Sequence, residues 1–133
     1  MKRILLIAVL AIFIFSCNKS DDPDKPAEKY KVTYSFSAVG LDTLEYIKYL
    51  NVEGNEVSIA DTNEFNLSFE QPSNNIHGRI SIKGKTGTMT SSSAEYSMKV
   101  TDKSDGIIYI KESGTNFPET SFTWSAEYKN IEN

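Results

Sequence analysis

The sequence predicts an all-β fold, an antiparallel β-sandwich or small barrel of about seven to eight strands. From residue 30 onward, apolar residues take alternate positions, as in strands that bury one face. Turn-forming Gly, Pro, Asn and Asp clusters recur every 8–14 residues, about the spacing typical of all-β domains. No helical periodicity longer than one turn follows residue 20. These observations favour two sheets packed over a shared core.

The strands follow from the alternation in chain order. They are expected at residues 30–36, 43–52, 56–60, 64–70, 79–83, 94–100, 107–112 and 121–128. The second strand carries apolar groups on both faces, with Leu44 and Tyr46 on one and Ile47 and Tyr49 on the other. It is therefore expected to be central or covered on both sides.

The turns between these strands are expected where glycine, proline and short polar residues gather. Residues 53–55 read as a hairpin turn, and 71–78 as a longer turn cluster that contains His77. Gly84 is expected to end the strand at 79–83, and residues 102–106 form a further turn.

The N-terminus predicts a cleavable signal helix. Lys2 and Arg3 precede an unbroken apolar run at 4–15. This run is shorter than the ~20 residues of a membrane span and fits a signal-peptide core. The alternative, a buried helix of the domain, is disfavoured because the chain turns polar at once and then becomes strand-like.

The only cysteine follows this apolar run, in Ile14-Phe15-Ser16-Cys17. The stretch resembles the lipobox of bacterial lipoproteins. The resemblance implies cleavage between Ser16 and Cys17 and a diacylglycerol on Cys17. The alternative is a free thiol, but a redox or metal role needs partners, and the chain has no second cysteine.

A polar tether follows, so the expected parts are 1–16 (signal), 17–29 (lipidated flexible tether) and 30–133 (domain). Its composition cannot bury enough apolar surface to offset the entropy of ordering. Lys19, Asp21 and Asp22 resemble the tethers of Bacteroidota lipoproteins, where acidic residues beside the lipidated cysteine direct export to the outer leaflet of the outer membrane. A generic solvated linker is the open alternative. The expected location is the cell envelope, lipid-anchored at the outer membrane and either surface-exposed or periplasmic.

Charge and composition exclude several classes of partner and chemistry. Removing 1–16 takes away two cations and no acid, which changes the formal net charge from −4 to −6. Nucleic acid is therefore not an expected partner. His77 has no Asp or Glu within six residues, and 102–106 lacks the oxygen spacing of a calcium loop. We expect no catalytic residue, metal site or cofactor; a small hydrolase is the disfavoured alternative.

Aromatic residues are the remaining candidates for binding. Most of them fall on inward faces by alternation, but Tyr49 and Phe117 do not fit that pattern. Exposed aromatic rings stack on sugars or anchor protein partners. Tyr49 and Phe117 are therefore candidate ligand-binding residues for a protein or a glycan.

The order of strand motifs also carries a family resemblance. The matching residues are Tyr30, Val32, Tyr34, Tyr46, Tyr49, Asn51, Gly54, Ile108 and Ile110. They resemble small Bacteroidota lipoproteins with an immunoglobulin-like β-sandwich and, more distantly, the soluble part of the mycobacterial membrane protein small family, which accompanies lipid exporters. The resemblance implies an immunoglobulin-like sandwich that acts as a non-enzymatic binding or interaction module. The alternative that it implies is an accessory subunit of an envelope transporter.

Replacing Cys17 by Ser tests the predicted anchor. Serine offers no thiol for lipid attachment, so Cys17→Ser should accumulate as unprocessed precursor or leave the membrane fraction. Fractionation and mass spectrometry of the N-terminus measure both effects, with the neighbouring Ser20→Ala as control. A Cys17→Ser protein that is processed and fractionates like the parent would refute the lipoprotein prediction.

Overall fold

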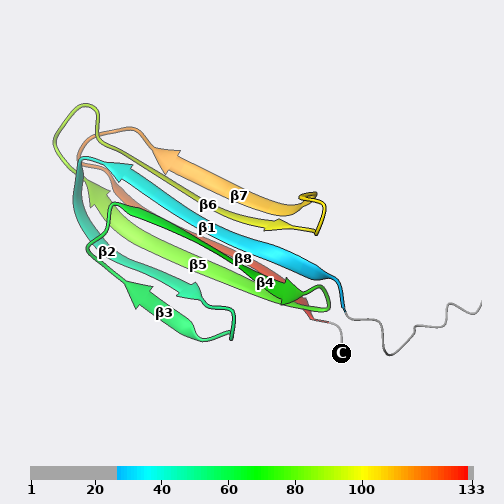
Figure 1. The fold of residues 1–133 in the computed structure, drawn as a ribbon. Coiled ribbons are helices and arrows are strands. Elements are labelled where there is room, and N and C mark those ends of the chain that lie inside the picture. The colour runs from blue at the N-terminus through cyan, green and yellow to red at the C-terminus, as the bar shows by residue number, and fades with distance from the viewer. Residues whose placement is uncertain (1–26, 132–133) are drawn as a thin grey trace, which may run out of the picture.

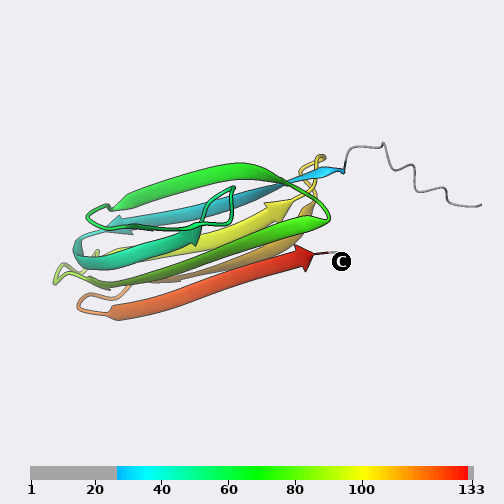
Figure 2. The same cartoon turned by 90° about the horizontal axis from the view of Figure 1, so that it is seen from below.

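A computed structural model describes residues 27–131 as a β-sandwich of two antiparallel four-stranded sheets (Figures 1 and 2). The strands are β1 (Lys29–Val39), β2 (Leu41–Leu50), β3 (Glu56–Ile59), β4 (Glu64–Pro72), β5 (Asn75–Thr86), β6 (Ser93–Thr101), β7 (Ile107–Thr115) and β8 (Ser121–Ile131). Their orders are β4-β1-β6-β7 in one sheet and β3-β2-β5-β8 in the other. The all-β prediction is confirmed. The predicted signal, lipidation and export residues lie outside the described residues.

The core lies between the two sheets and follows the period-two pattern. On β1, Val32, Tyr34 and Phe36 are buried, and the residues between them are more exposed. On β6 the same alternation buries Tyr96 and Met98. Aromatic rings of β1 and β6 contact aromatic rings of β8 across the sandwich. The core residues that come from β2, β5 and β8 are Leu44, Ile47, Ile76, Ile80, Ile82, Phe122, Trp124 and Ala126. Burial of this shared apolar surface stabilises the sandwich.

The chain crosses from one sheet to the other between β1 and β2, and a single glycine lies at this crossover. Gly40 has a φ of 58°, a left-handed conformation that residues with a side chain adopt rarely. A Cβ atom there would also lie 2.6 Å from the Oγ atom of the buried Ser92. Glycine therefore meets both requirements of this crossover.

The strand β5 is longer than predicted and corrects the boundaries at 71–78 and Gly84. It begins at Asn75 and continues through Gly84 to Thr86, so His77 lies in a strand and not in a turn. The prediction took these glycines as turn signals, but here they allow neighbouring side chains to pack closely against the strand. A Cβ at Gly78 would lie 2.5 Å from Cε of Met98, and one at Gly84 would lie 2.7 Å from Cζ of Phe122.

The face assignment of the second strand was also wrong. The ladder between β2 and β5 shifts between Leu44 and Tyr46, and both Leu44 and Ile47 are buried in the core. A β-bulge adds one residue and resets the alternation. Strict period-two counting therefore placed Leu44 and Ile47 on opposite faces.

One tyrosine hydroxyl joins the two sheets through the core. Tyr34 on β1 donates to the backbone carbonyl of Leu50 and accepts from the backbone N–H of Arg79, both at 3.1 Å. The ladder between β2 and β5 ends at the pair Tyr49 and Ile80, one step before these two groups. The hydroxyl thus takes the place of a direct bond between the strands. Burial raises the pKa of Tyr34 to about 12, so it stays protonated at neutral pH.

Replacing Tyr34 by Phe tests this link. The variant keeps the ring but leaves two backbone groups without their partner, which should lower the free energy of unfolding by about 1–3 kcal/mol. The wild type should also lose stability between about pH 10 and 12, because there the unfolded tyrosine releases its proton while the folded one keeps it. Denaturant unfolding across this pH range measures both effects.

Tyr46→Phe serves as the control, since this tyrosine is not among the buried core residues. An alkaline loss of stability that is as steep in Tyr34→Phe as in the wild type would contradict the link.

Candidate functional site

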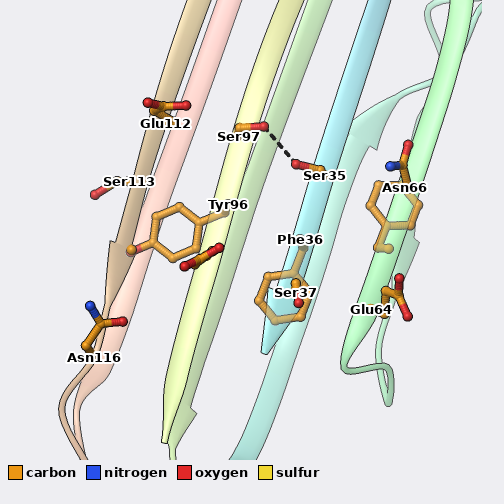
Figure 3. A pocket seen from close by; sticks show the side chains of 13 residues that line it. Ser35, Phe36, Ser37, Glu64, Asn66, Tyr96, Ser97, Glu112, Ser113 and Asn116 are labelled. Carbon is orange, nitrogen blue, oxygen red and sulfur yellow. Dashed lines mark hydrogen bonds between the residues drawn. The ribbon is translucent and has the colours of Figure 1, made fainter. Parts of the chain in front are cut away.

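The outer face of the sheet β4-β1-β6-β7 is hollowed into a polar cavity of about 620 Å³ (Figure 3). Two adjacent cross-strand rows build it. We call it the acidic trough, and its residues are Ser35, Ser37, Glu64, Asn66, Glu95, Ser97, Glu112 and Gly114. These residues come from four strands that are far apart in sequence, so only the folded sheet brings them together.

The depth of the trough comes from side-chain size. Small residues form the floor: Ser35 lies opposite Ser97, and their hydroxyls are 2.7 Å apart (Figure 3). Longer side chains flank this floor, with Asn66 on β4 and Glu112 on β7 in the same row. A strand points successive side chains to opposite faces, so the burial of Phe36 turns its serine neighbours outward.

The carboxylates of the trough form no ion pair with any described residue. No Lys, Arg or His lines the cavity, and among residues 27–131 no such nitrogen lies within 4 Å of Glu64, Glu95 or Glu112. By contrast, Glu45 on β2 pairs with Lys83 at 2.7 Å. The trough therefore presents carboxylates that are not ion-paired within the described residues, together with further hydrogen-bond acceptors.

The trough offers no exposed ring for stacking on a sugar. Phe36 and Tyr96 border the cavity between the polar residues, but both are buried in the core. Phe65 is partly buried and packs against the same core. Because stacking is the usual aromatic contribution to a sugar site, this surface favours a cationic partner over a glycan.

The structure does not bring the two predicted aromatic residues together. Tyr49 is half-buried, with its ring centre 5.9 Å from that of Tyr34 and 5.1 Å from that of Phe65. Phe117 is 70% exposed in the loop between β7 and β8. Its backbone carbonyl accepts a hydrogen bond from the hydroxyl of Thr86 at 2.7 Å. Neither residue is part of the trough.

Sequence reasoning missed the trough itself. Its available signal was the polar half of the alternation, such as Ser35 and Ser37 between buried aromatics. That signal does not reveal which polar residues share a row, because the pairings of β1 in the trough join positions 27 to 62 residues apart.

His77 has a carboxylate partner that the local sequence did not reveal. Its Nε2 lies 2.9 Å from Oε1 of Glu127 on the neighbouring strand β8. This pair is one half of the arrangement that a catalytic serine needs. Within residues 27–131 no serine or threonine hydroxyl is hydrogen-bonded to His77, so the pair carries no argument for hydrolysis.

The acidic turn at 102–106 closes on itself. One oxygen of Asp102 accepts the backbone N–H groups of Ser104 and Gly106, both at 2.8 Å. Asp105 adopts a φ of 59°, as turns of this kind require. In the described part of the chain, no three His, Cys, Asp or Glu side chains are grouped so as to hold a metal ion.

Comparison with models of known protein families and with curated proteins finds no match for this chain. Separately, residues 27–131 contain no helix that is long and apolar enough to cross a membrane. The class that the described residues define is an antiparallel β-sandwich with an acidic trough on one outer face.

Substitutions separate the binding candidate from the packing residue. Phe117→Ser should change the free energy of unfolding by less than about 0.5 kcal/mol, because the side chain is exposed. Tyr49→Ala should lower it by about 2–4 kcal/mol, because its ring packs against two others. Chemical denaturation of both variants checks the contrast, and a Phe117→Ser loss as large as that of Tyr49→Ala would contradict it.

Proposed function

We propose that this chain is a non-enzymatic lipoprotein of the cell envelope that binds a partner through the acidic trough. In this proposal the signal helix at 1–16 is removed, and lipid on Cys17 anchors the domain at the outer membrane. The lipobox resemblance and the acidic residues Asp21 and Asp22 support this part. The finer assignment as an immunoglobulin-like sandwich also belongs to the proposal and is supported by the strand-motif resemblance.

The partner that the trough fits is a basic segment of another protein. The observation that carries this is the grouping of Glu64, Glu95 and Glu112 around a serine floor, with no described Lys, Arg or His lining the cavity. Ammonium and guanidinium groups form charge-assisted hydrogen bonds to carboxylates, which are stronger than neutral ones. The serines and Asn66 add acceptors for the remaining N–H groups. An accessory subunit of an envelope transporter would be one case of such a module.

The shape of the surface fits a docked chain segment. The trough crosses all four strands of its sheet, from Glu64 on β4 to Glu112 on β7. An extended segment lying across these strands would place successive basic side chains over the two rows. Charge complementarity of this kind mainly sets partner choice and the rate of association.

Neutralising the trough tests the proposal. The variant Glu64→Gln/Glu95→Gln/Glu112→Gln should bind a labelled oligolysine peptide at least about tenfold more weakly than the parent, because the three carboxylates that attract the peptide lose their charge. Fluorescence anisotropy at low and high salt measures the affinity. A matched control, Glu53→Gln/Asp105→Asn/Glu119→Gln, removes the same charge from exposed positions outside the trough.

Comparing the two variants distinguishes binding at the trough from general electrostatic attraction by the whole protein. Equal losses in both would show that net charge alone attracts the peptide and would refute the trough as a site. Failure of the parent to bind oligolysine would refute it as well. A neutral oligosaccharide series forms the third arm, and binding there that depends on the trough carboxylates would replace the basic partner by a glycan.

A further inference from the structure

The edge strand β7 is the least protected border of the sandwich. It pairs only with β6, so its other side presents backbone N–H and C=O groups without a strand partner in the described chain. Ile107, Ile108 and Ile110 are 56%, 42% and 48% exposed. The strand is nine residues long and contains no proline. Long apolar edges of this kind are templates for pairing with another strand.

Each of the other three edges carries a protective feature, whereas the charged residues of β7, Lys111 and Glu112, follow its exposed isoleucines. The strand β3 has only four residues. The strand β4 ends in Pro72 and contains Glu70, which is ion-paired with Lys29. On β8, the backbone carbonyl of Ser125 accepts a hydrogen bond from the Nζ atom of Lys111 at 2.6 Å. Short strands, proline, charges and covered backbone groups are the usual devices against edge pairing.

A strand suits this edge better than a lipid surface. Lipid would cover the isoleucines but leave the backbone groups of β7 without hydrogen bonds, which is unfavourable in an apolar medium. A further β-strand satisfies the backbone groups and covers the isoleucines together. The occupant is therefore a strand.

We propose that this strand is β7 of a second copy of the chain, paired antiparallel about a two-fold axis. Antiparallel pairing that continues the sheet places residues of the same face opposite each other. With the axis at Tyr109, Ile108 of each copy lies opposite Ile110 of the other. With the axis at Ile110, Ile108 lies opposite Glu112 and Tyr109 opposite Lys111.

The charge pattern of β7 is compatible with both alignments. Neither places like charges opposite each other, whereas an axis at Lys111 would oppose two lysines, which is unfavourable. In both alignments the isoleucines gather near the axis. This self-complementarity favours a second copy over an unrelated peptide, and it depends neither on the trough nor on the lipid.

Cysteine cross-linking in intact cells tests the pairing with the full chain. A cysteine placed on a two-fold axis meets its own copy, so Tyr109→Cys or Ile110→Cys should give a disulfide-linked dimer on mild oxidation. The parent controls for Cys17, and Thr123→Cys provides an exposed position on the edge strand β8. A dimer band seen only with the β7 cysteines supports the proposal.

A second measurement keeps the test independent of cross-linking. Detergent-extracted parent protein should sediment with twice the monomer mass, and Ile110→Lys should sediment as a monomer, while Thr123→Lys stays dimeric. A monomeric parent without a β7-specific disulfide would overturn the proposal. A β7 cysteine that cross-links to a different protein would overturn it too, by naming another strand as the occupant.

Discussion

The hydroxyl of Tyr34 is the constraint on which the arrangement of the sandwich depends. It bonds to Leu50 on β2 and to Arg79 on β5, and so fixes the position of β1 over the opposite sheet. Gly78, next to Arg79, leaves room for Met98 in the core, since a Cβ there would lie 2.5 Å from Cε of Met98. Once Tyr34 points inward, the pleat turns Ser35 outward. The same pleat that buries Tyr34 and Phe36 in the core therefore places the serine floor of the trough on the outer face.

The three glutamates of the trough are the feature that packing does not explain. Some carboxylates elsewhere on the surface lie close to cations, as Glu56 does to Arg79 at 3.0 Å. Exposed pairs of this kind contribute little to stability, so leaving three carboxylates without them is tolerable in water. What sets them apart is that they are grouped in one hollow with hydrogen-bond acceptors between them. A cationic partner would supply the complementary charge that the lining of this hollow lacks.

The sequence predicted the strands well where alternation is strict, and less well where tertiary packing overrides local preference. β1 follows the period-two pattern throughout its buried part, and β6 follows it as far as Val100. In β5, glycines read as turn signals, but Gly78 and Gly84 lie within the strand because neighbouring side chains occupy the space of a Cβ. The trough could not be predicted from the sequence for a different reason. Its rows depend on which strands are neighbours, and a single sequence shows no long-range pairing.

The two surfaces proposed here share the strand β7, and this has a consequence for binding. Glu112 belongs to the trough, and Ile110, two residues earlier, points to the same face of the sheet. Pairing of two β7 strands would extend that sheet across both copies, so both troughs would open on one continuous face. A partner with two basic segments would then engage both at once, and the second contact would be intramolecular. Two shallow, individually weak acidic sites would thereby act as one stronger site, without any deepening of the trough itself.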